Sequence, residues 1–337
     1  MDLFAGKSKK SFSKTVVNLV GGALAAAGGW IVYSKTSIDH DLPLPLAITA
    51  ERAVYYSQQA GRVSYYHDRA KAGVPLLLVH SVNAAASAFE MKPLFEHFRQ
   101  FRSVFAVDLP GYGFSERSDR VYSPQLFETA LLDLMANLDA GPFDVVALSL
   151  GSEFAARAAL ARPDLFRSLA LISPSGLKAA GSGKASQQAG DRGYADSVYE
   201  ALSAPLWGRP LFDLITTRKS IQYFLSQSFV GTVPTELIDY SYQTSHQPGA
   251  EHAPLYFLSG QLFTPDVRGR VYQNLGTPGL VLYDRDNYVS FDRLPELLRA
   301  NPHWQAVRIA PTLGLPHWEK LSATVEALEA FWKTLGE

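Results

Sequence analysis

A serine stands where an apolar run meets a helix-like stretch in the segment DVVALSLGSEFAARAAL. The run Val145–Leu148 predicts a buried strand, and Ala147 and Gly151 place a small residue two positions before and after Ser149. This spacing is typical of a sharp strand-to-helix turn that holds a serine hydroxyl above the edge of a sheet. The hydroxyl could then act as a nucleophile, with the Leu150 N–H donating to an oxyanion. The alternative is that Ser149 only caps the helix.

Two other segments carry the groups that a serine nucleophile needs. A serine hydroxyl attacks a carbonyl only with help from a base that a third group orients. His317 follows a predicted strand and loop and begins the last predicted helix, in PHWEKLSATVEALEAFW. Asp284 and Asp286 directly follow another predicted strand, in LVLYDRDNYVS. The chain order serine, aspartate, histidine predicts a triad of Ser149, Asp286 and His317 at the ends of three strands.

The elements that must position these residues alternate along the chain. Short apolar runs separated by helix-period stretches predict a largely parallel sheet with helices on both faces. The predicted strands are Arg62–Tyr66, Leu76–His80, Val104–Asp108, Val145–Ser149, Leu169–Ser173, Leu280–Tyr283 and Ala306–Ile309. The predicted helices are Phe89–Phe101, Gln125–Leu138, Ser152–Ala161, Leu294–Ala300 and His317–Leu335.

Residues 176–276 interrupt this alternation, because no central strand is predicted there. The interval opens with KAAGSGKASQQAGDRG, a composition typical of a flexible linker, and continues with aromatic-rich helical segments. A loop of about 100 residues is improbable inside a compact domain, so we expect a helical insertion. It leaves from the edge where active sites of such sheets lie, and is therefore placed to act as a lid. The core then comprises residues 50–175 and 277–337.

Taken together, these motifs resemble those of the α/β-hydrolase superfamily, in its capped, serine-nucleophile, esterase-like branch. VFAVDLPGYGFSERS matches the family stretch D-x-P-G-x-G-x-S, and LLLVHSVNAAASAF looks like the strand and His-Gly loop that supplies the second oxyanion donor. The resemblance runs from about Arg62 to the C-terminus. It implies a doubly wound, mostly parallel α/β-hydrolase sheet with a helical cap inserted after the sixth core strand.

The resemblance also implies roles for two residues of the oxyanion loop. By analogy, the backbone N–H of Val82 is the second donor, although Ser81 stands where the family usually has glycine. Asn83 is a candidate side-chain donor to the oxyanion, and the alternative is that it bonds its own loop backbone. His80 is expected to hydrogen-bond within the loop rather than act as a base.

The acid loop and the elbow also depart from the family pattern. The acid loop usually reads Gly-x-x-Asp-x-x-Val, and Asp286 fits its aspartate, but Tyr283 occupies the glycine position and leaves Asp284 as a rival acid. Ala147 replaces the first elbow glycine with another small residue.

The predicted activity is hydrolysis of a carboxylic ester through an acyl-enzyme. The same triad serves C–C bond hydrolases, cofactor-free haloperoxidases and acyltransferases in the superfamily, and the fold does not decide among them. A different class also stays open, a membrane-tethered binding protein without catalysis. Its discriminating test is a generic aryl-ester assay with and without a serine-reactive phosphonate.

Composition limits partners and cofactors. A net charge of −1 gives no basic excess for nucleic acid, so the expected partner is a small-molecule ester or related acyl substrate. The chain has no cysteine, which excludes disulfides and thiol chemistry. Its histidines lack companions at ligand spacing, so we expect neither a metal nor a cofactor. The oligomeric state does not follow from the sequence.

The N-terminal segment, residues 1–36, combines four lysines with a long uncharged run, Val16–Tyr33. A helix that spans a membrane needs about 20 apolar residues. Small residues at every fourth position and aromatic residues at the far end also favour an anchor, with the catalytic domain outside the cytoplasm. Two alternatives remain: a signal peptide cut near Ala25–Ala27, and a helix packed on a soluble cytoplasmic domain.

Overall fold

The computed structural model describes residues 25–69, 72–179 and 192–336. Its sheet has eight strands in the order β1-β2-β4-β3-β5-β6-β7-β8. The β1–β2 and β2–β4 pairs are antiparallel and all other pairs are parallel, as predicted for a mostly parallel sheet. The strands are β1 (Glu51–Ser57), β2 (Gly61–Asp68), β3 (Leu76–Val79), β4 (Val104–Asp108), β5 (Phe143–Leu148), β6 (Phe166–Ile172), β7 (Gly279–Tyr283) and β8 (Trp304–Arg308).

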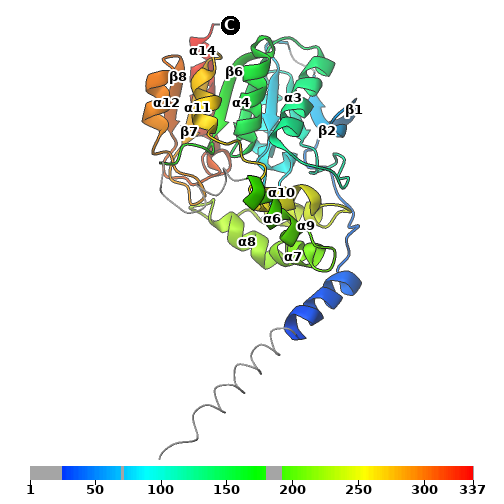
Figure 1. The fold of residues 1–337 in the computed structure, drawn as a ribbon. Coiled ribbons are helices and arrows are strands. Elements are labelled where there is room, and N and C mark those ends of the chain that lie inside the picture. Colours follow the sequence, from blue (N-terminus) through cyan, green and yellow to red (C-terminus); the bar gives the residue numbers. More distant parts are fainter. Residues whose placement is uncertain (1–24, 70–71, 180–191, 337) are drawn as a thin grey trace, which may run out of the picture.

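Helices cover both faces of this sheet (Figure 1). Side chains alternate along each strand, so Leu77 and Val79 of β3 join one buried apolar cluster while Leu76 and Leu78 join the other. The first cluster includes residues of α3 (Pro124–Leu138), α4 (Gly151–Ala161) and α12 (Leu294–Ala300). The second includes residues of α2 (Lys92–Phe98) and α14 (Leu321–Thr334). Shorter elements are η1 (Ala88–Met91), η2 (Pro163–Leu165), η3 (Tyr272–Asn274) and α13 (Pro316–Glu319).

A helical insertion separates β6 from β7, after the sixth strand, and gathers at one end of the sheet (Figure 1). No strand interrupts it in the described part of residues 176–276; the stretch 180–191 of the expected linker lies outside that part. Its helices are α6 (Arg192–Leu202), α7 (Gly208–Ile215), α8 (Arg218–Ser226), α9 (Thr235–Ser245), α10 (His252–Leu258) and α11 (Val267–Arg270).

Strand β1 was missed by the sequence analysis. It pairs with β2 through a tight hairpin, in which Ser57 lies opposite Gly61, and it forms the edge of the sheet. An edge strand has one neighbour and keeps part of its surface in water, so its apolar signal is weak. Tyr56, 79% exposed, shows this directly.

Upstream of the sheet, residues 25–37 are helical and residues 38–50 lead to β1. In the part of the chain that the structure describes, we find no helix with the length and apolarity needed to cross a membrane. Residues 16–24 of the expected anchor lie outside that part. The described helix contacts the insertion, because the Trp30 indole Nε1 donates to the carbonyl of Pro210 at 2.7 Å.

Candidate active site

Ser149 lies immediately after β5, in the left-handed region of backbone conformation with φ 51°. Its N–H donates to the carbonyl of Ile172, the last residue of the neighbouring strand β6, at 2.8 Å. A Cβ on Gly151 would come within 2.2 Å of the carbonyl oxygen of His80. The small residue after the serine is therefore needed because the elbow packs directly against the end of β3.

The two amides expected to hold an oxyanion lie on either side of this contact. Across the described residues, neither the Leu150 N–H nor the Val82 N–H donates to an acceptor. Both residues are nearly fully buried. Unpaired buried amides are costly unless a ligand or water receives them, so their presence at the elbow fits an anion-stabilising role.

Glu90 holds the oxyanion loop in place, a role that no sequence motif predicted. Its carboxylate accepts hydrogen bonds from the Ser81 N–H at 2.8 Å and the Ser81 hydroxyl at 3.0 Å. Burial raises the pKa of Glu90, and the bonds from Ser81 and Asn83 oppose that rise. An acidic residue between Phe89 and Met91 was the available signal, because a charged residue is rarely buried without partners.

Asn83 supports the loop rather than facing the oxyanion as a donor. Its side-chain Nδ2 donates to Glu90 and to the Ser81 hydroxyl, both at 2.9 Å. Its Oδ1 accepts from the Ala85 N–H at 2.8 Å. The side-chain amide is thus committed within the loop, which is the alternative that the sequence left open.

His80 is fixed inside the core and does not face the elbow as a base. The Leu109 N–H donates to its Nε2 at 3.0 Å, so the ring proton lies on Nδ1, which donates to the Ser81 carbonyl at 2.5 Å. Burial lowers the pKa of His80 to about 4, which keeps the ring neutral.

The two aspartates after β7 have different surroundings. Asp284 is buried and accepts from Arg308 Nε at 2.6 Å and from the Thr312 N–H at 2.9 Å. Burial alone would raise the pKa of Asp284, but the Thr312 amide and Arg308 bring it below its ordinary value. Asp284 therefore ties β7 to the end of β8 and to the loop that leads to His317.

Asp286 also lies beside the loop that leads to His317. Its Oδ1 accepts from the N–H groups of Tyr288 and Val289 at 2.7 and 3.2 Å. Its Oδ2 lies so close to Gly314 that a Cβ there would come within 2.8 Å. Burial raises the pKa of Asp286. The carboxylate thus lies beside the backbone three residues before His317.

His317 lies in α13, at the same sheet edge as Ser149, because β5 and β8 run parallel. It is fully buried, and its Nε2 lies 2.8 Å from the carbonyl oxygen of Glu90, which also accepts from Trp318 Nε1. Its Nδ1 has no hydrogen-bond partner among the described residues. The structure brings the expected triad to one edge without joining His317 to Ser149 or Asp286 by a hydrogen bond.

Glu319 was also missed by the sequence analysis. One carboxylate oxygen accepts from the N–H groups of Val230 and Gly231 at 2.7 and 3.0 Å, and the other accepts from the Leu313 N–H at 2.9 Å. It therefore joins the loop before His317 to the helical insertion. The pattern PHWE gave no sign of this, since all three partners are backbone groups and two of them, Val230 and Gly231, are distant in sequence. Within the described ranges, we find no cluster of three metal-ligating side chains.

This fold and the elbow define the class of the protein. A family model described as the alpha/beta hydrolase family matches residues 76–327, and the chain belongs to that family. It is an enzyme of the hydrolase class.

Two curated relatives match over shorter stretches. An esterase of Mycobacterium tuberculosis is 45% identical over 76 residues, 22% of this chain and 26% of the relative. The (E)-2-((N-methylformamido)methylene)succinate hydrolase of Acinetobacter baylyi is 29% identical over 111 residues, 33% of this chain and 41% of the relative. The matches thus cover less than half of either relative.

A solved structure matches over almost the whole chain. A membrane phospholipase A, described as a bacterial virulence factor, has a TM-score of 0.63 at 18% identity, covering 97% of this chain and 99% of that one. At this identity the likeness shows the fold.

Proposed function

We propose that this hydrolase cleaves carboxylic esters through an acyl-enzyme on Ser149. The observation that carries the proposal is the elbow, where a serine with φ 51° stands beside two buried amides, Leu150 and Val82, that have no acceptor in the described structure. A serine that only capped the helix would gain nothing from strained backbone, and the residue at the N-cap position of α4 is Leu150, not Ser149.

In the proposed reaction, the Ser149 hydroxyl attacks the ester carbonyl and His317 takes its proton. The amides of Leu150 and Val82 hold the oxyanion, a contact worth about 3–4 kcal/mol for each donor. His317 then protonates the leaving alcohol, and Asp286 orients the imidazole and stabilises its cation. Water, activated by the same histidine, cleaves the acyl-enzyme and frees the acid.

This reaction requires His317 to leave its contact with Glu90. The ring Nε2 must exchange the Glu90 carbonyl for the Ser149 hydroxyl, and the unpaired Nδ1 must receive Asp286 as its partner. The position of Asp286 beside Gly314, which is three residues before His317 in the chain, supports that exchange.

The same triad leaves C–C hydrolysis, haloperoxidase chemistry and acyl transfer to an alcohol as alternatives. The name of the Acinetobacter relative, a hydrolase of a substituted methylenesuccinate, favours small carboxylated substrates as a second group to test. The name of the Mycobacterium relative favours esters.

The direct test is covalent labelling. Incubation with a fluorophosphonate should add one phosphonyl group to Ser149 and abolish hydrolysis of p-nitrophenyl butyrate in parallel. Peptide mass spectrometry identifies the modified residue. Labelling of another serine, or full activity after stoichiometric labelling of Ser149, would contradict the proposal.

The pH dependence of the reaction should report the burial of His317. Burial lowers the pKa of His317 from 6.5 to about 4. The base must be neutral, so activity is lost as pH falls through the pKa of the folded enzyme, and the acid limb of kcat/KM should lie below pH 6.5. The measurement uses a neutral ester between pH 4 and 8, with Tm followed at each pH. An acid limb at or above pH 6.5 would show that His317 titrates as an exposed histidine or is not the base.

We further infer that the helical insertion is a cap over Ser149 and that residues 16–33 associate with a membrane. The insertion leaves directly after β6, and Glu319 binds it to the His317 loop. The uncharged run after four lysines supports the membrane association. The relative of matching length is named a membrane phospholipase A, which agrees with it.

A further inference from the structure

The described N-terminal helix is bound directly to α7 of the insertion. Trp30 Nε1 donates to the Pro210 carbonyl at 2.7 Å, and the Ser34 hydroxyl donates to Asp213 at 2.5 Å. Both contacts are made within one turn of the end of the uncharged run, at Tyr33. The helix thus contacts α7 directly.

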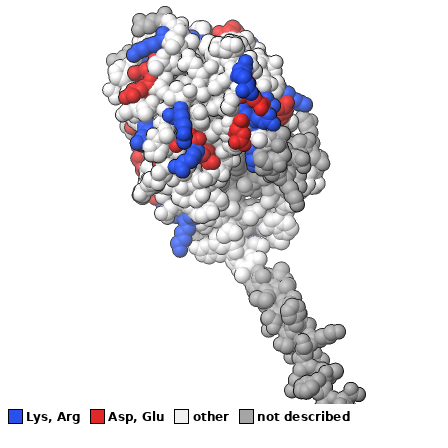
Figure 2. Space-filling model, turned by 90° about the vertical axis from the view of Figure 1, so that its left-hand side faces the viewer, with Lys and Arg blue, Asp and Glu red and all other residues white. Residues whose placement is uncertain are grey.

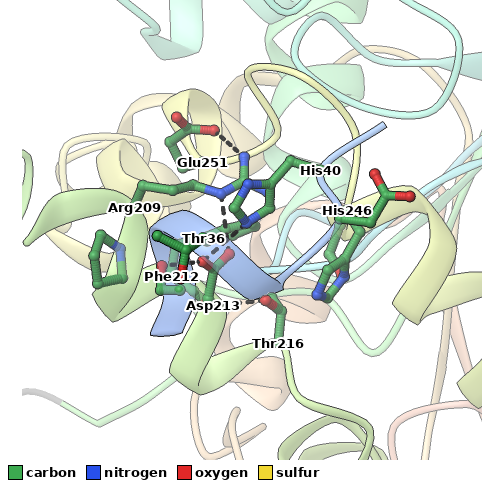
Figure 3. Close-up of polar contacts among 12 residues, drawn as sticks. Thr36, His40, Arg209, Phe212, Asp213, Thr216, His246 and Glu251 are labelled. Carbon is green, nitrogen blue, oxygen red and sulfur yellow. Dashed lines mark hydrogen bonds and ion pairs between the residues drawn. The ribbon is translucent and has the colours of Figure 1, made fainter. Parts of the chain in front are cut away.

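A buried ionic network joins this helix and the residues after it to α7 (Figure 3). Asp213 is fully buried, and beside Ser34 it accepts from His40 Nε2 and from Arg209 Nε, both at 3.0 Å. Arg209 Nη1 also donates to Glu251 at 2.6 Å. A buried carboxylate with these partners cannot leave them cheaply, because any gap strands a charge away from water.

The direct contact limits the distance between α7 and a lipid surface. A helix rises about 1.5 Å per residue, and Trp30 is only four residues before Ser34. If the uncharged run enters lipid, Trp30 and Tyr33 occupy the interfacial layer that such aromatics prefer. Pro210 and Asp213 then lie within about one helical turn of that layer.

The part of the insertion nearest the N-terminal helix also exposes large apolar side chains. In Figure 1, α7 and α8 form the end of the molecule that this helix meets. Tyr223 on α8 is 62% exposed and Leu206, just before α7, is 57% exposed. Trp207, Leu214, Phe224, Val230 and Tyr288 are also exposed, and the Tyr288 hydroxyl donates to the Phe224 carbonyl. We call these seven residues together the apolar face of α7 and α8.

The distribution of charged side chains agrees with that of the exposed apolar ones. In Figure 2, most of the acidic and basic side chains lie over the upper part of the molecule, whereas the lower part of the described surface on this face is almost uncharged. At the start of α8, Arg218 and Lys219 are exposed, and Arg218 pairs with Asp239. Exposed aromatic and aliphatic residues beside cationic ones are typical of surfaces that lie in the interfacial layer of a bilayer.

We propose that the apolar face of α7 and α8 rests on a lipid bilayer and places the insertion, and the site that it adjoins, at the membrane surface. The inference rests on the proposed membrane association of residues 16–33. It adds that the enzyme is held flat against lipid rather than on a stalk, and it points to esters dissolved in the bilayer as the substrates that reach Ser149.

The absence of cysteine from the chain permits a direct test. Single variants of the full-length protein, Tyr223→Cys, Val32→Cys and Tyr56→Cys, are labelled with the fluorophore NBD and mixed with phosphatidylcholine–phosphatidylglycerol vesicles that carry a doxyl quencher. Val32 reports the N-terminal helix, and Tyr56, on β1 of the core, is the matched control because its side chain is at least as open to solvent as the other two. We expect doxyl lipid to quench the labels at 32 and 223 at least twofold, with little effect at 56.

The three positions separate the two proposals. Quenching at 32 without quenching at 223 would keep the membrane association and overturn the flat placement of the insertion. Quenching at none of the three would overturn both. Equal quenching at all three would show nonspecific adsorption and would also overturn the placement. All three substitutions are at exposed positions, and ester hydrolysis by each labelled variant verifies that it is folded.

Discussion

Replacing Ser149 by alanine should abolish ester hydrolysis, with a loss on the order of 10⁶-fold in kcat. Without the hydroxyl no acyl-enzyme forms, and the amides of Leu150 and Val82 can only polarise the substrate for attack by water. The fold should persist, because alanine fits the crowded turn beside Gly151 and tolerates φ 51° about as well as serine does. The measurements are kcat/KM on an aryl ester and the urea midpoint.

Ser173→Ala is the matched control for this variant. Ser173 follows β6 as Ser149 follows β5, has φ 45°, and is buried. Its N–H donates to the carbonyl of Leu282 on the next strand, just as the Ser149 N–H donates to Ile172. We expect Ser173→Ala to keep kcat within about tenfold of the parent enzyme. Near-normal turnover by Ser149→Ala would remove this serine from the mechanism.

Asp286→Asn should lower kcat by about 10⁴-fold with little change in stability, because an amide can hold the wrong tautomer of His317 and cannot stabilise its cation. Asp284→Asn, two residues away, should behave in the opposite way. This substitution removes the charge of a buried carboxylate that accepts hydrogen bonds from Arg308 and from the Thr312 N–H. It should reduce the free energy of unfolding by about 1–3 kcal/mol and have a small effect on kcat.

Paired measurements of kcat/KM and urea midpoints on the two variants test this assignment. If Asp284→Asn is the catalytically damaging change, then the acid is Asp284 and Asp286 only orders its own loop. Loss of activity in both variants with a native urea midpoint would mean that the carboxylates act together on His317.

Several elements followed from local sequence because their signals are local. The strand Val104–Asp108 and the helix Leu294–Ala300 have the predicted bounds. An unbroken apolar run and an amphipathic period can each be recognised within a few residues of sequence. The small residues on both sides of Ser149 predicted the elbow, with helix capping as the alternative. The close approach of Gly151 to the His80 carbonyl shows why a small residue is needed there. By contrast, β1 was not predicted from the sequence, because its strand conformation depends on its pairing with β2.

The sequence by itself determined the fold class, the position of the helical insertion and the strand ends at which Ser149, Asp286 and His317 stand. It favoured Asp286 over Asp284 through the Asp-x-x-Val pattern and left two roles for Asn83 open. The contacts that distinguish the surroundings of these residues are made with groups far away in the chain, Arg308 and Glu90. The sequence could not show that Asp213 joins the N-terminal helix to α7, or that His317 meets the Glu90 carbonyl. A sequence pattern records what each residue needs, burial or a polar partner, and only the tertiary structure decides which distant group meets that need.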